Sequence, residues 1–405
     1  MRILVISQYF WPENFRINDL SIGLKNRGHE VTVLTGYPNY PEGNIYQDFK
    51  ANPKLYSSLN GMDVIRVPML PRKKGSIALV LNYISFFLSA SFFGLWKTKR
   101  KQFDVILCCQ LSPVTVALPA ILLKKVRKIP LILWSLDLWP ESLAAVGQVK
   151  SAKVLSVIGR LVEYIYFNCD LILGQSKSYL EAVDKRNGSR TPLALFPNWA
   201  EDLFSEINMG SKSSGRLNVI FAGNIGEAQD LGALIKCVEI LQSKKVSVLF
   251  SMVGDGRNRR WLESEIKRKG LSSYFIFHGS HPLEAMPEFY SKADVAFVSL
   301  KRDYIFERTI PGKVQSYMIA GLPILSMLDG EGSRLVSDSN CGLTSPSGDY
   351  LSLAKNIIRF VGMEETELRE LGLNGCSYAR EHFSKDNLMY QLESYMNDLV
   401  IEGRV

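Results

Sequence analysis

The residues best suited to chemistry lie in the segment RTIPGKVQSYMIAGLPIL, which begins at Arg308. Pro311 and Gly312 interrupt the chain before a helix that we expect over residues 313–320. This geometry directs free N–H groups of the helix and the Lys313 ammonium toward one point, and Arg308 adds a bidentate donor. A diphosphate fits that point. The alternative is that Lys313 is a solvated charge.

A glycine-bearing turn is expected where a helix follows the buried strand NVIFA. Gly223, Asn224 and Gly226 occupy this turn, and glycine lets a phosphate approach backbone N–H groups closely. Gly254 holds the same place after the next strand. Each turn is equally consistent with an ordinary tight connection, because strand, glycine turn and helix recur in every doubly wound domain.

Two further groups of polar residues follow strands in the first half of the chain. Asp137 and Glu141 come after the strand LILW, where a carboxylate can orient or deprotonate an attacking hydroxyl group. The alternative for Asp137 is a helix N-cap. In the loop QYFWPENFRI, Asn14 and Arg16 lie near the start of a helix, where the dipole favours anions. A solvated loop with an arginine salt bridge is equally open.

The elements that must position these residues alternate between short β-branched runs and longer helical patterns. This alternation is typical of parallel sheets with helices on both faces. A stretch from 197 to 217 loses the apolar periodicity and predicts a linker. We therefore predict two doubly wound α/β domains, residues 1–200 and 201–380, with a helical segment 381–405 that crosses back to the first domain. The expected strands are Arg2–Ile6, Glu30–Leu34, Asp63–Val67, Asp104–Cys108, Leu131–Trp134, Leu171–Gly174, Asn218–Ala222, Ser247–Val253, Tyr274–His278, Val295–Val298 and Pro323–Met327. Helices are expected over 349–362 and 364–400.

Composition sets the class of protein. The chain has 405 residues, of which 46% are hydrophobic, so a disordered protein is excluded. Residues 1–200 carry 25 Lys and Arg against 13 Asp and Glu, whereas the remainder carries 23 against 27. The first half therefore faces an anionic partner. No basic stripe alternates with exposed aromatic residues, so a membrane or a phosphorylated lipid fits better than a nucleic acid.

Cysteine spacing and the first residues indicate the compartment. The six cysteines show no CxxC spacing and have no nearby histidine, so we expect buried thiols in a reducing compartment and no metal site. The apolar part of MRILVISQYF is too short for a signal peptide. We expect a cytoplasmic protein.

One segment complicates this expectation. Residues 75–96 contain no charge, and Arg72, Lys73 and Lys74 precede them while four basic residues follow within 97–101. Three structures remain open: an interfacial helix, an ordinary buried helix or a membrane span. Serines inside the segment and positive charge at both ends favour the interfacial helix.

Taken together, QYFWPENFRI, LDLWPES, FAGNIGEAQDL and PGKVQSYMIAGLPIL resemble the family 4 glycosyltransferases of the GT-B fold, over essentially the whole chain. They are most similar to the subgroup that builds O-antigen, capsule and colanic acid, which includes N-acetyl-L-fucosamine transferases. The resemblance implies metal-independent transfer with retention of configuration, in a cleft between two Rossmann-like domains, with no cofactor besides a UDP-sugar as co-substrate.

The resemblance also implies roles for particular residues. It assigns the nucleotide-sugar site to Gly223, Asn224, Gly226, Gly254, His278, Arg308, Gly312, Lys313 and Ser316, the acceptor site to Asn14 and Arg16, and catalysis to Asp137, Glu141 and Lys313. Three features depart from the family. Ser316 stands where many relatives have the second of two spaced glutamates. Asn224 and either Gln229 or Asp230 stand where many relatives have an Arg and a Lys. The usual catalytic histidine is not obvious, so its role passes to Asp137.

The expected function is transfer of a UDP-activated N-acetylated deoxysugar to a saccharide on polyprenyl diphosphate, at the cytoplasmic face of the inner membrane. Three alternatives remain open. They are a GDP-sugar fucosyltransferase, a nucleotide-sugar epimerase using the same two domains, and a non-catalytic scaffold that binds nucleotide sugars.

Overall fold

The structure is a computed structural model, and it describes residues 1–73, 75–145, 149, 151–205, 207 and 215–402. The chain forms two compact units. Unit 1 comprises Met1–Phe196 and Met389–Val405, and unit 2 comprises Pro197–Leu388. Part of the expected linker, residues 206 and 208–214, lies outside the described residues, as does Lys74.

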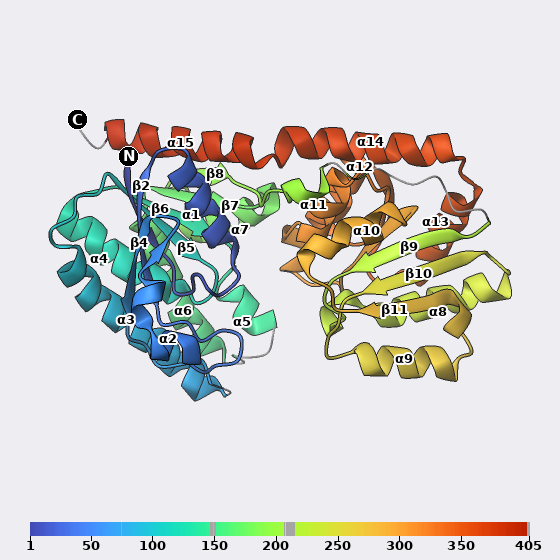
Figure 1. Cartoon of the computed structure of the whole chain (residues 1–405), viewed down its shortest axis with the longest axis horizontal. Helices are drawn as coiled ribbons and strands as arrows, with labels where there is room; N and C mark the ends of the chain where they lie inside the picture. Colours follow the sequence, from blue (N-terminus) through green and yellow to red (C-terminus); the bar gives the residue numbers. More distant parts are fainter. Residues whose placement is uncertain (74, 146–148, 150, 206, 208–214, 403–405) are drawn as a thin grey trace. The chain divides into compact units, whose positions relative to one another are not determined.

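Unit 1 is built on an eight-stranded sheet in the order β3-β4-β2-β1-β5-β6-β7-β8 (Figure 1). Every neighbouring pair is parallel except β3 and β4. The strand order reverses direction at β1 and β5, which makes the edge beyond their carboxyl ends the expected place for a ligand. The strands are β1 (Arg2–Ile6), β2 (Glu30–Gly36), β3 (Ser58–Leu59), β4 (Met62–Val67), β5 (Val105–Gln110), β6 (Leu131–Ser135), β7 (Leu171–Gly174) and β8 (Leu193–Leu195).

Helices cover both faces of this sheet. On one face α3, α4, α6 and α7 pack side by side in that order, as right-handed crossovers require. On the other face α1 lies next to α15 (Figure 1), and Arg27 at the end of α1 pairs with Glu393 at 3.0 Å. The helices are α1 (Arg16–Asn26), α2 (Gln47–Ala51), α3 (Ser76–Thr98), α4 (Ala117–Arg127), α5 (Glu141–Ala145), α6 (Ala152–Phe167), α7 (Lys177–Asn187) and α15 (Lys385–Glu402).

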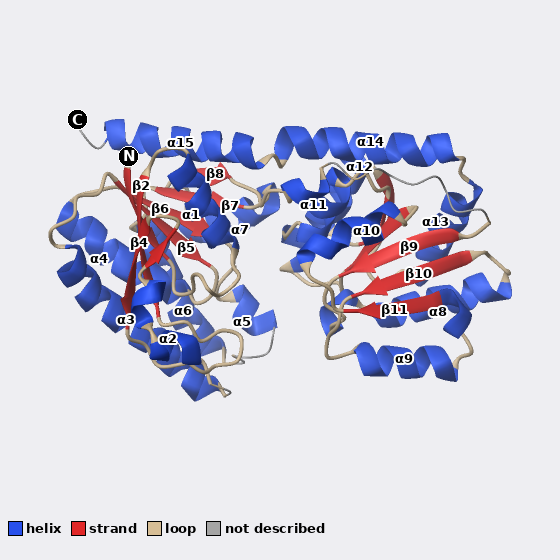
Figure 2. Ribbon diagram, viewed as in Figure 1, coloured by secondary structure: helices blue, strands red, loops and turns tan. Residues whose placement is uncertain are grey.

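Unit 2 contains a six-stranded parallel sheet in the order β11-β10-β9-β12-β13-β14. Figure 2 shows β9, β10 and β11 side by side in this sheet. Its order reverses at β9 and β12. The strands are β9 (Leu217–Ala222), β10 (Val248–Val253), β11 (Phe275–Gly279), β12 (Val295–Ser299), β13 (Ile324–Met327) and β14 (Gly342–Ser345). The helices are α8 (Leu231–Ser243), α9 (Arg259–Arg268), α10 (Met286–Ser291), α11 (Gly312–Ile319), α12 (Gly330–Asp338), α13 (Tyr350–Gly362) and α14 (Glu365–His382).

Successive side chains of β9 point into apolar layers on opposite faces of the sheet, so the sheet is buried on both faces. Val219 and Phe221 join the apolar layer under α8, α9 and α13. Ile220 and Ala222 point the other way, into the layer under α10, α11, α12 and α14. Successive side chains of a strand face opposite sides, so a nearly continuous apolar run is what a doubly covered parallel strand requires.

The prediction of two doubly wound α/β domains is confirmed. Three short strands, β3, β8 and β14, were not predicted; each has four residues or fewer and lies at a sheet edge. The helix expected over 364–400 is wrong as a single element, because it breaks between α14 and α15. Ser384 lies at that break and accepts a hydrogen bond from the Asn387 N–H, as an N-cap does.

Candidate functional site

The residues predicted to bind the nucleotide sugar follow the carboxyl ends of unit 2 strands. Gly223 to Gly226 follow β9, Gly254 follows β10, and α11 follows β12. Because β9 and β12 are neighbours where the strand order reverses, the turn after β9 and helix α11 meet at the expected ligand position.

The two glycine turns pack backbone against backbone. A Cβ atom at Gly254 would lie 2.0 Å from the Gly223 carbonyl oxygen, and one at Gly256 would lie 2.3 Å from the Ile225 oxygen. Gly223 and Gly254 also have φ values of 128° and 137°, which side chains rarely tolerate. The close contact between the two turns therefore requires glycine at positions 254 and 256.

The N–H groups of the first turn already have partners. The Gly223 N–H donates to the Val253 oxygen at 2.8 Å, and the Gly226 N–H donates to the Gln229 side chain at 3.1 Å. The Asn224 side chain is exposed and lies against the position that a Cβ of Gly226 would take. Because these two N–H groups are already bonded, the binding of an anion at this turn depends more on a cationic side chain than on them.

Lys313 is that cation. It is the second residue of α11, and its ammonium lies 3.7 Å from the centre of the Phe221 ring. Its side chain crosses the face of Gly223, where a Cβ would approach the Lys313 Cε to 2.7 Å. Burial lowers the pKa of Lys313 to about 7. No acceptor among the described residues forms a hydrogen bond or ion pair with it, so it is poised for an anionic ligand.

Helix α11 is held in place by polar contacts at both sides. The Ala222 N–H donates to the Tyr317 hydroxyl at 2.9 Å, which ties the helix to the end of β9. Ser316 donates to the Glu201 carboxylate at 2.6 Å, and the Gln315 amide donates to the Asn198 oxygen at 2.6 Å. Gly312, the first residue of the helix, has open space around it.

Glu201 is a candidate that the sequence did not reveal. Its carboxylate reaches Ser316, the position at which relatives were expected to have a glutamate. The two residues are 115 apart in sequence, and Glu201 falls in the stretch interpreted as a linker. No local spacing could have paired them.

Arg308 and His278 are not brought to Lys313 by any described contact. The Arg308 guanidinium stacks on the Tyr304 ring at 3.5 Å and donates to the Tyr304 oxygen at 2.7 Å. His278, next to last in β11, is exposed, and its ring centre lies 5.1 Å from that of Phe289. Partial burial, together with the positive charge of the neighbouring His281 and Lys292, lowers the pKa of His278.

A hollow of about 540 Å³ opens beside the second glycine turn, at the start of α9. Asp255, Gly256, Arg257, Arg259, Arg260 and Glu263 line it. Arg259 is engaged with Glu263 at 2.9 Å, whereas Arg257 and Arg260 are exposed. The cluster adds positive charge next to the turn that carries Asn224.

In unit 1 Asp137 lies just beyond β6. Its carboxylate accepts a hydrogen bond from the Trp139 indole at 2.9 Å, and the Ser142 and Ser112 hydroxyls lie close to it. Burial raises the pKa of Asp137, and these three polar groups partly oppose the rise. Helix α5 begins only at Glu141, so Asp137 does not cap it. A held carboxylate with a raised pKa has the character of a general base.

The other unit 1 candidates differ in their surroundings. Glu141 accepts two bonds from Arg186, at 2.5 and 3.1 Å, so it forms an ion pair within the unit. Arg16 is the first residue of α1, and Asn14 is exposed in the loop before it.

A buried carboxylate that the sequence did not flag holds this loop. Glu13 is 2% exposed and accepts the N–H groups of Phe10, Asn39 and Tyr40 at 3.2, 2.8 and 2.7 Å. Burial raises its pKa, while these bonds lower it. Glu13 therefore joins the loops after β1 and β2 and positions Asn14.

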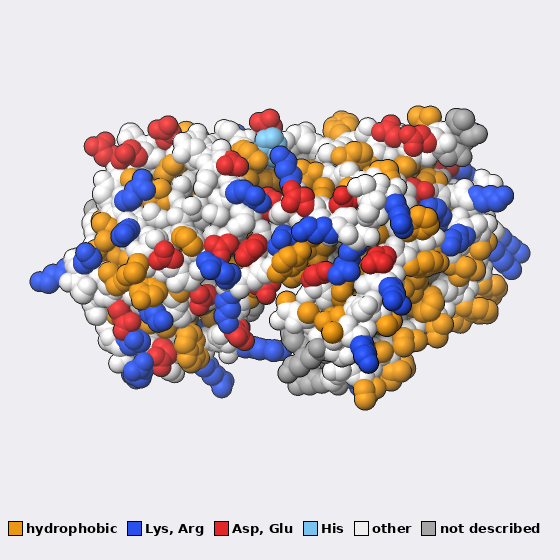
Figure 3. Space-filling model, turned by 180° about the vertical axis from the view of Figure 1, so that it is seen from behind, with side chains coloured by type: hydrophobic (Ala, Val, Ile, Leu, Met, Phe, Trp, Pro, Cys, Tyr) orange, Lys and Arg blue, Asp and Glu red, His pale blue; other side chains and the backbone are white. Residues whose placement is uncertain are grey.

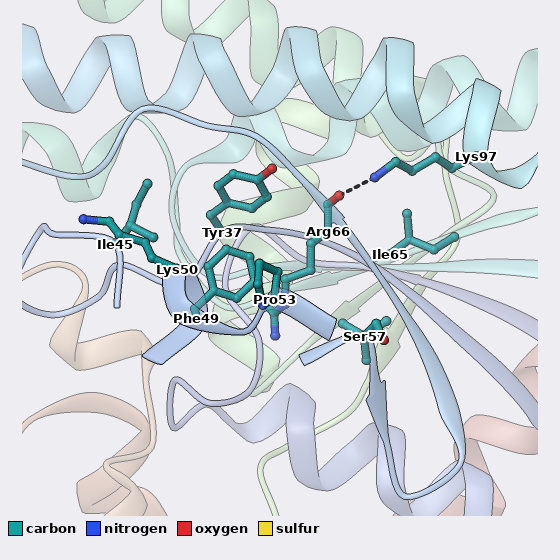
Figure 4. Close-up of a pocket in the computed structure, with 10 residues that line it drawn as sticks. Tyr37, Ile45, Phe49, Lys50, Pro53, Ser57, Ile65, Arg66 and Lys97 are labelled. Carbon is teal, nitrogen blue, oxygen red and sulfur yellow. Dashed lines mark hydrogen bonds between the residues drawn. The ribbon is translucent and has the colours of Figure 1, made fainter. Parts of the chain in front are cut away.

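A pocket of about 530 Å³ lies beside α3 in unit 1 (Figure 4). Its wall is mostly apolar, and its charged residues are all basic. The lining residues are Tyr37, Ile45, Phe49, Lys50, Pro53, Ser57, Val64, Ile65, Arg66 and Lys97. In Figure 4, Lys97 reaches from α3 to the backbone oxygen of Arg66, at 2.8 Å. The pocket suits an amphipathic anion.

Comparison with known families divides the chain in the same two parts. A family described as "Glycosyl transferase 4-like domain" matches residues 14–199, and a family described as "Glycosyl transferases group 1" matches residues 216–362.

Individual relatives match most of the chain. The putative colanic acid biosynthesis glycosyl transferase WcaI of Escherichia coli (strain K12) is 25% identical over 343 residues, 79% of this chain and 82% of WcaI. The probable glycosyltransferase WbjE of Pseudomonas aeruginosa is 23% identical over 333 residues, 78% of this chain and 80% of WbjE. Among solved structures, Anabaena Alr3699/HepE in complex with UDP and glucose has a TM-score of 0.67 at 15% identity, covering 98% of this chain and 99% of HepE. That last likeness concerns the fold.

Proposed function

Because the chain is a glycosyltransferase of the GT-B fold, we propose that unit 2 binds a nucleotide diphosphate sugar and that unit 1 binds a lipid-linked saccharide acceptor. The glycosyl transferase 4-like domain comes first in the chain, and the glycosyl transferases group 1 domain follows it. The proposal depends on one observation about Lys313. Its ammonium is partly buried, has no counter-charge among the described residues, and lies where the strand order of unit 2 reverses.

The donor's diphosphate would occupy the space between Lys313 and the turn from Gly223 to Gly226. There the ammonium neutralises the charge that develops on the departing nucleotide. Glu201, bonded to Ser316 one turn further along α11, would accept hydrogen bonds from hydroxyl groups of the donor. Gly254, His278, Arg308 and Gly312 complete the proposed donor site.

The acceptor side of the proposal rests on unit 1. Asp137 would accept the proton of the attacking hydroxyl, with Glu141 held nearby by Arg186. Asn14 and Arg16 would contact the saccharide. The pocket beside α3, apolar with a basic lining, would take the polyprenyl diphosphate, because that group combines a lipid chain with negative charge.

The finer identity follows the resemblance of the four motifs. We propose a UDP-sugar donor, in line with HepE, whose structure holds UDP and glucose. We further propose N-acetyl-L-fucosamine as the sugar, retention of configuration without a metal, and a role in surface polysaccharide synthesis at the cytoplasmic face of the inner membrane, as WcaI is named for colanic acid.

Donor binding and transfer test this function together. UDP- and GDP-sugars are added to the purified protein, and the ligand bound only by the native state raises the melting temperature. Transfer is then measured with that donor and a polyprenyl-diphosphate-linked saccharide. Lys313→Ala should lower turnover at least tenfold, since it removes charge stabilisation of the leaving group. Lys244→Ala is the control, because Lys244 is exposed at the far end of α8.

Full activity in Lys313→Ala would refute the proposed role of Lys313. A UDP-sugar that binds without any glycosidic product would instead favour the scaffold, and conversion of the free sugar nucleotide into an epimer would favour the epimerase.

A further inference from the structure

Helix α3 presents its most apolar side chains outward. Seven large hydrophobic residues along it are between 45% and 79% exposed: Ile77, Val80, Leu81, Ile84, Leu88, Phe92 and Trp96. Most follow one another at four-residue steps, so they form one stripe. From Ile77 to Trp96 the stripe runs roughly 28 Å at 1.5 Å per residue. Only 28% of the most apolar stretch of α3 is buried, and among the described residues α3 alone has the length and composition to cross a membrane.

The inner face of α3 is anchored to unit 1 by buried aromatic, polar and small residues: Tyr83, Phe86, Asn82, Ala90, Gly94 and Thr98. The Asn82 side chain is fully buried; its oxygen accepts from Gln8 at 2.8 Å, and its nitrogen donates to the Leu70 oxygen at 2.5 Å. Gly94 lies so close to the sheet that a Cβ would approach Leu34 to 2.8 Å. The helix is thus fixed to unit 1 by these contacts, and its stripe is left unpartnered.

Neighbouring helices extend the apolar surface. Val126 on α4 and Val157 on α6 are 56% and 65% exposed, and Phe167 at the end of α6 is 60% exposed. Figure 3 shows hydrophobic side chains gathered over this side of unit 1, at the lower right of the view, with basic side chains among them. A contiguous patch of this kind marks an interaction surface.

The charges around the stripe are mostly positive. Helices α3 and α4 contain no Asp or Glu, and α6 contains only Glu163. Exposed basic residues lie at both ends of α3 and along the two neighbouring helices: Lys73, Lys97, Lys99, Arg100, Lys125, Lys128, Lys153 and Arg160. Such a rim attracts anionic lipid headgroups.

We propose that the outward stripe of α3 lies flat in the headgroup region of an anionic bilayer, with α4 and α6 resting beside it, so that unit 1 is a monotopic membrane-binding domain. The apolar side chains enter the acyl boundary, and the flanking lysines and arginines contact lipid phosphates. The pocket beside α3, whose lining includes Lys97, would then lie near the headgroup region, where a lipid-linked acceptor resides.

Two contacts decide between flat docking and insertion across the membrane. Asn82 bonds to Gln8 and Leu70, and Gly94 packs on β2, so a spanning α3 would have to break these contacts. An ordinary buried helix is inconsistent with the exposure of Leu88 and Phe92. A second copy of the chain would find the same basic rim on its partner, which repels.

Vesicle binding by the full-length protein tests the inference. The protein is sedimented with vesicles of phosphatidylcholine alone and with vesicles containing phosphatidylglycerol, without any sugar substrate. We expect at least tenfold stronger partitioning onto the anionic vesicles, falling as salt rises. The double variant Leu88→Gln/Phe92→Gln should lose at least tenfold in binding, because both side chains would contribute buried apolar area.

The matched control is Leu351→Gln/Leu373→Gln in unit 2, where the exposed fractions, 56% and 58%, are close to the 57% of Leu88. It should bind vesicles as the parent does. Melting temperatures confirm that each variant is folded.

Unchanged binding by Leu88→Gln/Phe92→Gln would overturn the proposal. Two other results would also overturn it. One is that the protein resists alkaline extraction from membranes, as a spanning helix does. The other is a dimer in solution that this variant dissociates, while neither the dimer nor the monomer binds vesicles. The proposed lipid-linked acceptor is a separate matter: a protein that binds vesicles but transfers no sugar refutes the proposed function and leaves the docking surface standing.

Discussion

The proposed chemistry of unit 2 depends on one side chain, that of Lys313. Its position over the Phe221 ring and across Gly223 leaves the ammonium partly buried, and the lowered pKa follows from that burial. An anionic ligand would stabilise the protonated form and bind best to it.

Donor binding should therefore weaken as the solution becomes more alkaline. The diphosphate of a UDP-sugar does not titrate near neutral pH, whereas free Lys313 loses its proton around pH 7. We expect the Kd to be nearly constant below pH 7 and to rise up to about tenfold for each pH unit above it, measured by calorimetry. Lys313→Met should bind weakly with a flat profile, and a parent profile equally flat would contradict this assignment.

Glu201 allows a second test at the same scale. Glu201→Gln keeps an oxygen that can accept from Ser316, so the melting temperature should change little. Loss of the charge weakens hydrogen bonds from donor hydroxyls, and we expect the KM for the donor to rise roughly tenfold, about 1.4 kcal/mol. The control is Asp202→Asn, which neutralises the adjacent exposed acid and should leave the KM unchanged. An unaltered KM in Glu201→Gln would remove this residue from the donor site.

At the scale of elements, the contact between the two glycine turns of unit 2 leaves no room for a side chain at Gly254. Gly254→Ala would place a methyl group 2.0 Å from the Gly223 oxygen, so the turns must separate or the protein must lose stability. We expect a cost of roughly 2 kcal/mol or more, seen as a lower denaturation midpoint. Gly362→Ala is the control, since nothing lies within 4 Å of the position that a Cβ of Gly362 would take, at the end of α13. Equal stability of the two variants would contradict the packing.

Local structure could be predicted from the sequence, whereas contacts between residues far apart in the sequence could not. Local periodicity and turn chemistry predict the helix after Pro311, the glycine turns and every strand except β3, β8 and β14. The contact between Glu201 and Ser316 and the three bonds to Glu13 depend on tertiary packing, which spacing does not encode. For α3, composition gave an apolar helix, but only its contacts with β2 and Leu70 decide which face points outward.

At the scale of the whole molecule, unit 2 is inserted between two parts of unit 1. Met389, Leu392 and Met396 of α15 are buried, and Glu393 bonds to His29 at 2.7 Å and to Arg27. Ending the chain at Leu388 should therefore destabilise unit 1 and spare unit 2, whose residues are all retained.

Calorimetry of the chain that ends at Leu388 checks this expectation. The transition assigned to unit 1 should fall by several degrees, since three buried side chains are worth about 1.5–3 kcal/mol each. The transition that shifts upward with a UDP-sugar should stay in place. A chain that melts like the parent would show that α15 contributes little.

The inserted arrangement also sets the order in which a ribosome completes the two units. The sheet of unit 1 emerges first, yet the helix that shields its α1 side is translated after every residue of unit 2. Throughout that interval the nascent chain carries an uncovered apolar flank together with the outward stripe of α3. A growing chain of this protein therefore exposes apolar surface until translation of α15 is complete.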